Sequence, residues 1–455
     1  MSSRLLIAGV VAAVTVTAAA FVVTQDRSTT IKRITDASPD APGVAWVTDA
    51  SASGIDGAVF ADPRTGSEYP WGAGSIQIDS TVMTLAVAPD GDGPNSDAVM
   101  LGIDADTGEV RWTAPAPGLA TCASLPLDGQ LVCTETPYDE DPGIVTFDVD
   151  SGNSHQYDTE AGIVAATVAN DHLYTADGDI EGSDVRIHRG TLDDHDADWT
   201  RPLYVSAGWE DQYADRLQVG TKTGHFDLGG GFATFDAETG AEIWATDTLD
   251  DCMTASHRTV GNLAIGVEHD CASPYAPTAT TAFSTDGRVV ATTPITAESY
   301  ASIDDPTDAS VPVVLGDAAF DRVSGTELWR DESLVYTQPA TEWSDESQRS
   351  SLIAVIGDIG ILQRDDSRAG IDLRTGDERW TMDEPWSIFG HEGSIVLAAM
   401  QDNLIALDIR SGHQLWSAPF DNITPGSQPT TFVDGEGGSY LLQSESKLTR
   451  LVPLP

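Results

Sequence analysis

Short β-favouring segments on either side of glycine-containing turns dominate the pattern of apolar and polar residues. Met100–Ile103 and Val110–Thr113 form one such pair, and the turn between them contains Gly108. Two strands joined by a turn of this kind are the sequence pattern of a β-hairpin. Helical spacing of apolar residues is nearly absent after the first 25 residues. The chain is therefore predicted to be an all-β protein.

One hairpin signature recurs seven times: an apolar residue, Asp, two variable residues, Thr or Ser, and Gly. The aspartates of the seven copies are Asp62, Asp104, Asp148, Asp236, Asp321, Asp372 and Asp408. Five copies also carry a tryptophan four residues after the glycine. These five are Asp104, Gly108 and Trp112; Asp236, Gly240 and Trp244; Asp321, Gly325 and Trp329; Asp372, Gly376 and Trp380; and Asp408, Gly412 and Trp416. Chance would give roughly one match to the turn pattern, so the copies indicate a structural repeat.

Each position of the repeat has a mechanical role. The Asp side chain can accept hydrogen bonds from the backbone of the turn, and Gly supplies the positive φ that closes it. A tryptophan at a constant place on the second strand is too large for one sheet to cover, so we expect it to pack between neighbouring sheets. The alternative role for these tryptophans is a stacking platform for a flat cofactor.

The spacing of the copies predicts the architecture. Asp62 and Asp104 are 42 residues apart, and Asp372 and Asp408 are 36 apart. Two gaps of twice this length predict degenerate units at Val185–Trp199 and Thr281–Pro294. A period near 40 with four short strands per unit is typical of a β-propeller. We expect about eight blades, with nine fitting the count almost as well. The predicted closure pairs Gly57–Trp71 with the tail Ser439–Leu451.

The first 25 residues differ from the rest of the chain. Arg4 precedes an apolar run from Leu5 to Val23, which as a helix would cover roughly 28 Å, close to a bilayer core. We expect a single N-terminal transmembrane helix within residues 1–25 that serves as an uncleaved signal-anchor. Cleavage near Ala18–Ala20 is the alternative. Residues 26–43 are expected to be a polar linker, and residues 44–455 the propeller.

Charge excludes one class of partner. The chain has 72 acidic and 23 basic side chains, for a formal net charge of −49. Phosphates would be repelled, because no basic stripe is available to replace their counterions. The protein is therefore not expected to bind nucleic acid.

The four cysteines bear on location. Cys122 and Cys133 occupy the same part of one repeat that Cys252 and Cys271 occupy in another, which favours the disulfides Cys122–Cys133 and Cys252–Cys271. Disulfides persist outside the cytosol. A zinc site is the alternative, although the spacing does not match the usual ligand patterns.

Local motifs for catalysis or metal binding are missing from the sequence. It contains no His-Glu-x-x-His pair, no Gly-x-Ser-x-Gly elbow and no phosphate-binding Gly-x₄-Gly-Lys loop. The loop from Asp90 to Asp97 offers oxygen donors at alternating positions but departs from the EF-hand pattern, so we interpret it as a solvated acidic turn. The sequence therefore predicts no catalytic, cofactor-binding or metal-binding residue and no bound cofactor.

The repeated turn and its tryptophan resemble the tryptophan-docking motif of propellers named after pyrroloquinoline quinone (PQQ). The resemblance covers about residues 44–455. This family includes quinoprotein dehydrogenases, a lipoprotein propeller that scaffolds outer-membrane protein assembly, and sensor domains of bacterial kinases. The dehydrogenases resemble one another in a disulfide between adjacent cysteines, and this chain has no adjacent cysteines. Nor does a local motif here match their Ca²⁺ and catalytic residues.

The resemblance without the dehydrogenase residues implies a non-enzymatic protein. We expect a membrane-tethered binding or scaffolding module, single-pass in the cell membrane, with the propeller on the extracytoplasmic side and other envelope or membrane proteins as partners. The alternative from a different class is a PQQ- and Ca²⁺-dependent oxidoreductase. A third possibility is a sensor that depends on divalent cations, suggested only by the acidity.

Overall fold

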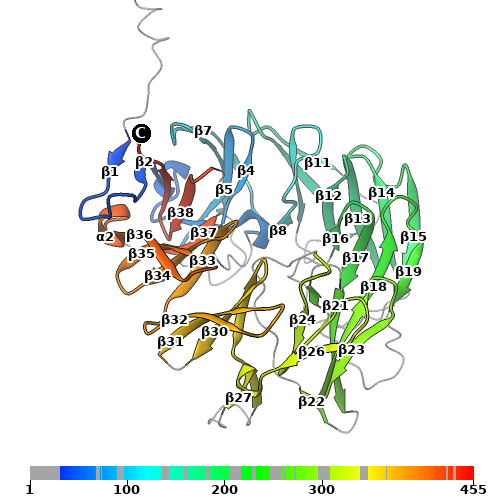
Figure 1. The fold of residues 1–455 in the computed structure, drawn as a ribbon. Helices are drawn as coiled ribbons and strands as arrows, with labels where there is room; N and C mark the ends of the chain where they lie inside the picture. The colour runs from blue at the N-terminus through cyan, green and yellow to red at the C-terminus, as the bar shows by residue number, and fades with distance from the viewer. Residues whose placement is uncertain are drawn as a thin grey trace, which may run out of the picture.

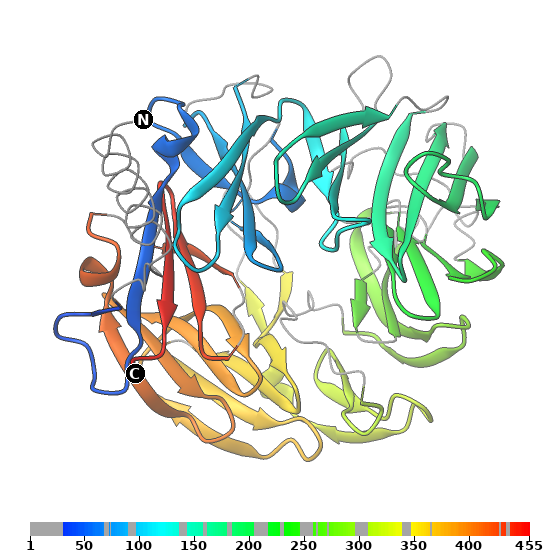
Figure 2. The same cartoon turned by 90° about the horizontal axis from the view of Figure 1, so that it is seen from above.

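The computed structural model describes residues 31–67, 72, 74–89, 97–135, 143–157, 162–179, 184–203, 217–227, 232–245, 258–260, 263–270, 273–295, 308–338, 347–364, 366–426, 429–433 and 437–455. Nearly all of the secondary structure in this part of the chain is antiparallel β-sheet. Its sheets are arranged as the blades of a ring (Figures 1 and 2). The structure is therefore an all-β propeller, as the repeat predicts.

The first five blades follow one another along the chain. Blade 1 contains β3 (Val59–Ala61), β4 (Ile76–Ile78), β5 (Thr81–Val87), β6 (Val99–Asp104) and β7 (Val110–Pro115). Blade 2 contains β8 (Leu119–Cys122), β9 (Gln130–Glu135), β10 (Ile144–Asp148) and β11 (Ser154–Tyr157). Blade 3 contains β12 (Ile163–Ala169), β13 (His172–Asp179), β14 (Asp184–Gly190) and β15 (Trp199–Leu203). Blade 4 contains β16 (Leu217–Val219), β17 (Thr223–Asp227), β18 (Phe232–Asp236) and β19 (Glu242–Ala245). Blade 5 contains β20 (Arg258–Val260), β21 (Leu263–Asp270), β22 (Ser273–Ser284) and β23 (Val289–Thr293).

The remaining blades complete the ring. Blade 6 contains β24 (Val313–Leu315), β25 (Ala318–Phe320) and β26 (Glu327–Arg330), and the hairpin of β27 (Val335–Gln338) and β28 (Ser347–Ser350) follows it. Blade 7 contains β29 (Leu352–Ile356), β30 (Ile359–Arg364), β31 (Ser367–Asp372) and β32 (Glu378–Met382). Blade 8 contains β33 (Ser387–Glu392), β34 (Ile395–Met400), β35 (Asn403–Asp408) and β36 (His413–Pro419). Blade 9 contains β37 (Pro429–Val433), β38 (Tyr440–Ser444), β39 (Lys447–Val452), β2 (Gly43–Asp49) and β1 (Lys32–Arg33). The short helices are η1 (Ala50–Ser53), η2 (Pro63–Thr65), η3 (Glu332–Leu334) and α2 (Phe420–Ile423).

The described strands form nine blades, so the expectation of eight is wrong. The error lies at the closure of the ring. Strand β2 pairs with β39, with Val47 opposite Thr449, and so completes blade 9 (Figure 2). The predicted closing segment instead supplies β3, which pairs with β5 in blade 1. Because the tail has its own partner in β2, it forms a separate ninth blade. The two degenerate units are present as the hairpins β14–β15 and β22–β23.

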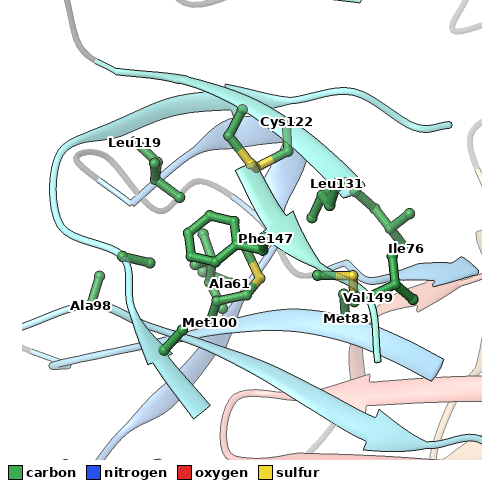
Figure 3. Close-up of a cluster of buried hydrophobic side chains, with 14 of the residues drawn as sticks. Ala61, Ile76, Met83, Ala98, Met100, Leu119, Cys122, Leu131, Phe147 and Val149 are labelled. Carbon is green, nitrogen blue, oxygen red and sulfur yellow. A yellow bond between two sulfur atoms is a disulfide. The ribbon is translucent and has the colours of Figure 1, made fainter. Parts of the chain in front are cut away.

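Apolar side chains fill the spaces between neighbouring blades. Eight clusters of buried residues in the described chain each join two adjacent blades. The cluster between blades 1 and 2, for example, brings Met83 and Met100 against Phe147 and Leu131 (Figure 3). Blades 4 and 5 meet through the rings of Trp244 and Phe283, whose centroids are 5.1 Å apart. The core is thus distributed around the ring, as expected when one sheet covers only one side of its neighbour.

The segment before β2 packs onto the ring. Strand β1 pairs with β2, Ile34 and Ala41 are buried, and the Ser38 backbone N–H donates to the Ser417 carbonyl over 2.8 Å. The last part of the predicted linker, from residue 31 onward, is therefore part of the propeller. No helix in the described residues is long and apolar enough to cross a membrane. The predicted transmembrane segment, residues 1–25, lies outside the described residues.

Candidate functional site at the junction of blades 2 and 3

The repeated turn is a self-contained hydrogen-bonded unit. In blade 1, Asp104 Oδ1 accepts from the Thr107 backbone N–H over 2.8 Å and from the Thr107 hydroxyl over 2.9 Å. The Gly108 N–H donates to the Asp104 carbonyl over 2.8 Å, with φ at 71°. Asp148, Asp236 and Asp321 make the same pair of side-chain bonds with Ser151, Thr239 and Ser324. These bonds lower the pKa of all three carboxyl groups, because they stabilise the ionised form.

The predicted tryptophans reach across to the next blade. Trp112, Trp329 and Trp380 donate their indole N–H to the carbonyls of Val149, Leu373 and Ile409, over 3.0, 2.7 and 2.6 Å respectively. Their rings lie on the turn glycines of those blades, which are Gly152, Gly376 and Gly412. Trp244 lies on Gly287 in the same way, and the Trp416 ring lies 6.4 Å from that of Tyr440 in blade 9.

Two further tryptophans do the same without the motif. Trp46 on β2 covers Gly108 and donates to the Ala105 carbonyl over 2.9 Å. Trp199 on β15 covers Gly240 and donates to the Glu238 carbonyl over 3.0 Å. Neither follows an Asp-Thr-Gly turn, so the motif could not identify them. Their position on a short β-favouring segment was the available signal.

The junction of blades 2 and 3 lacks this arrangement. In blades 1, 4, 6, 7 and 8 a β-bulge lies just before the tryptophan in the last hairpin. The tryptophan then lies opposite the residue that is two positions before the turn aspartate, as Trp112 lies opposite Gly102 in blade 1. Strands β10 and β11 pair without a bulge, so His155 lies opposite Thr146 at that place. Blade 3 in turn has the loop Thr191–Asp198 where other blades have the glycine turn. Neither the indole nor its receiving turn is therefore present at this junction.

A cavity of about 590 Å³ opens at this junction. Blade 2 contributes Asp128, Asp148, His155 and Tyr157 to its wall, and blade 3 contributes Leu192 and Asp193. We call this cavity the blade 2–3 groove. The groove has three carboxylates and no lysine or arginine in its lining.

Two of the groove's features favour a cationic ligand. The His155 and Tyr157 rings pack edge to face, with centroids 4.5 Å apart, and provide an aromatic surface. Asp148 stays ionised readily, since hydrogen bonds from Ser151 lower its pKa. Carboxylates beside aromatic rings suit an ammonium or guanidinium group. Of these residues only Asp148 belongs to the repeated turn, and the one signal in the sequence was the absence of a tryptophan four residues after Gly152.

The structure describes one of the two predicted disulfides. Cys122 on β8 and Cys133 on β9 lie directly opposite each other and form a disulfide. Both are buried in the core between blades 1 and 2 (Figure 3). Cys252 and Cys271 lie outside the described residues. Most of the acidic loop between Asp90 and Asp97 lies outside them as well.

Comparison with known proteins gives one family match. Residues 315–454 match the family model described as "Outer membrane protein assembly factor BamB". No curated protein matches the chain. The match runs from the end of β24 to β39, and the aspartate, glycine and tryptophan signature occurs three times within it.

Several solved structures are similar in overall arrangement. The crystal structure of BamB from Moraxella catarrhalis is 11% identical, with a TM-score of 0.42, covering 83% of this chain and 95% of that chain. The computationally designed Ika8 protein is 10% identical, with a TM-score of 0.43, covering 86% and 100%. A europium-containing methanol dehydrogenase is 10% identical, with a TM-score of 0.43, covering 88% and 84%.

Two observations bear on the family: the match of residues 315–454 to the family model, and the repeated turn elsewhere in the propeller. Blades 6 to 9 match the family model, and the same turn occurs in blades 1, 2 and 4. The matched residues and the recurring turn support a PQQ-like β-propeller family for this chain.

Proposed function

We propose that this chain is a non-enzymatic binding or scaffolding module for envelope proteins, and that the blade 2–3 groove receives a basic segment of its partner. The groove is the observation that carries the proposal. Its three carboxylates and paired rings lie where the repeat would otherwise place an indole. A net charge of −49 would also attract a basic partner over a distance.

The family match supports the scaffolding part of the proposal. The model that matches residues 315–454 is named for a factor in outer-membrane protein assembly. We extend that role to this chain, with a different partner surface set by its own blades 2 and 3.

The proposed location is the extracytoplasmic side of the cell membrane. The Cys122–Cys133 disulfide supports it, since such bonds are rare in the cytosol. The apolar run Leu5–Val23 would supply the tether. In this arrangement the propeller stands close to the membrane proteins it would bind.

Site-directed photo-crosslinking tests the groove in the full chain. A crosslinking residue at position 192 should give a discrete adduct with an envelope protein, whereas one at position 415, exposed on blade 8, should not. The double variant D128N/D193N should weaken the adduct at least tenfold, since both carboxylates line the groove. D79N is the matched control, because Asp79 and Asp128 are both exposed turn residues with φ near 50°.

Two results would contradict the proposal. One is the same set of adducts from positions 192 and 415. The other is a quinone absorbance band in the purified protein that requires added PQQ and Ca²⁺. The second result would favour an oxidoreductase instead.

A further inference from the structure

Two histidines and an aspartate converge on one face of blade 3. Asp177 lies on β13, His188 on β14 and His195 in the loop between β14 and β15. One ligand atom from each lies within 4.8 Å of the other two. Asp177 and His188 are each 4% exposed, and His195 is half-buried. This cluster is separate from the groove lining, although the loop that holds His195 also supplies Leu192 and Asp193 to the groove.

The sheet register brings the first two residues together. Thr175 lies opposite His188, so Asp177, two residues along, projects from the same face. Thr200 on β15 also lies opposite His188, and its hydroxyl is 2.9 Å from His188 Nδ1. A neutral His188 that donates its Nδ1–H to this hydroxyl presents the lone pair of Nε2. Ligand histidines in metalloproteins are oriented in this way by a second hydrogen bond.

The loop is held so that His195 lies over His188. Gly190 leaves no room for a Cβ atom, which would stand 2.3 Å from the Asp194 carbonyl oxygen. The Thr191 N–H donates to that same carbonyl over 2.8 Å. The two imidazole rings end with their centroids 5.0 Å apart. His195 is therefore positioned by backbone packing.

The buried polar atoms of the cluster face one another closely enough to share a ligand. Asp177 Oδ1 makes ion-pair contacts of 3.1 Å with His188 Nε2 and Arg186 Nε, and none of these three atoms has a well-aligned hydrogen bond within the described residues. Buried polar atoms in native proteins are nearly always satisfied, and an ion held between Asp177 Oδ1 and His188 Nε2 would give both atoms a well-aligned partner. The Arg186 side chain is 41% exposed and can move into solvent. Asp194 and Asp196 on the loop add negative charge beside the cluster.

We propose that Asp177, His188 and His195 bind a Zn²⁺ ion. Two imidazole nitrogens and one carboxylate oxygen are a donor set that Zn²⁺ prefers, and three protein ligands leave a fourth position open. Ligands about 2.0–2.1 Å from a tetrahedral ion stand roughly 3.3 Å apart, close to the spacing of Asp177 Oδ1 and His188 Nε2. His195 supplies the third ligand atom, which lies within 4.8 Å of the other two. The ion would fix the loop that forms one wall of the groove.

Calorimetric titration of the EDTA-treated full chain with ZnCl₂ tests the proposal. One equivalent should bind, and excess Ca²⁺ should not displace it, because Ca²⁺ prefers oxygen ligands. H195Q should weaken binding at least tenfold, and it should still fold because His195 is half-buried in a loop. H413Q, which changes an exposed histidine on blade 8, should bind like the wild type.

Substitution with Co²⁺ gives a second readout. The wild-type protein should show the visible absorbance of a four-coordinate site, and H195Q should lose it. Equal Zn²⁺ binding by H195Q and wild type, displacement by Ca²⁺, or the absence of a stoichiometric site would overturn the proposal. D128N/D193N should bind Zn²⁺ normally, so failure of the groove proposal would be recognised separately.

Discussion

The indole of Trp380 on blade 7 lies on Gly412 of blade 8 and donates its N–H to the Ile409 carbonyl, 2.6 Å away. Trp380 is 8% exposed, so this hydrogen bond lies in a nearly dry interface. The contact fastens one blade to the next through a side chain on one and a turn on the other. The same relationship recurs around the ring at Trp46, Trp112, Trp199 and Trp329.

Replacing Trp380 with Phe should destabilise the ring. W380F keeps an aromatic ring but leaves the Ile409 carbonyl unpartnered, at a cost of about 2 kcal/mol in the free energy of unfolding. Urea unfolding measures the change. L415A is a suitable control, since Leu415 is 43% exposed on the same pair of blades. Equal stability of W380F and the wild type would show that the hydrogen bond is unimportant.

The disulfide should contribute measurably to stability. Cys122 and Cys133 close a loop with a sequence separation of 11, for which chain-entropy arguments give roughly 3 kcal/mol. The double variant C122A/C133A should lose about this amount in urea unfolding. Reductant should lower the midpoint of the wild-type protein more than that of the variant. A variant as stable as the oxidised protein would contradict the expectation.

The turn aspartates should make the stability of the folded protein depend on pH. Hydrogen bonds from the Ser324 backbone N–H and hydroxyl lower the pKa of Asp321 in the folded protein. Its contribution is therefore complete well above the ordinary value of about 3.9, and it is lost as the pH falls through the lowered pKa. D321N does not titrate at this position. The difference in unfolding midpoint between wild type and D321N should change between about pH 6 and pH 3.

A second variant separates the effect of the hydrogen bonds to Asp321 from general charge effects. S324A removes one of the two hydrogen bonds to Asp321, so it should reduce the same pH dependence in part. Repulsion among the many other carboxylates is common to all three proteins and cancels in the comparison. A midpoint difference that stays constant with pH would rule out the role assigned to Asp321.

The loop of blade 3 should depend on Gly190. G190A places a methyl group against the Asp194 carbonyl oxygen, so the loop must shift, at a cost of about 1–3 kcal/mol. Hydrogen exchange of residues 191–198 should become faster. G220A is the matched control, because its new methyl group would meet only the Thr223 carbonyl oxygen at 3.5 Å. Unchanged exchange in G190A would mean that the loop is placed by other contacts.

The sequence predicts those parts of the fold well that are held by hydrogen bonds between residues close together in the chain. The aspartate, threonine and glycine of each turn bond to one another, so their spacing alone identifies the hairpins. The closing strand escapes such a prediction because no Asp-Thr-Gly turn precedes Trp46, and its partner β39 is remote in the sequence. The expected number of blades was wrong for this reason.

The candidate sites were beyond prediction for a related reason. At the groove, β10 and β11 pair without the bulge found beside the tryptophan in other blades, and a missing bulge leaves no motif in the sequence. Asp177, His188 and His195 have no recognised ligand spacing along the chain. The register of β13 against β14 and the fold-back of a loop bring them together. Both features depend on which strands pair and in which register. A search for local sequence motifs does not reveal this pairing.

The pairing of β2 with β39 has a consequence for biosynthesis. Strand β2 leaves the ribosome early, whereas β39 is the last strand of the described chain. Until β39 emerges, the strand that carries Trp46 lacks its partner in blade 9. The faces of blades 1 and 8 that pack against blade 9 are then still exposed to solvent. A growing chain thus carries an incomplete ring with two exposed apolar ends. The apolar ends of the ring can therefore be covered only after β39 has been synthesised.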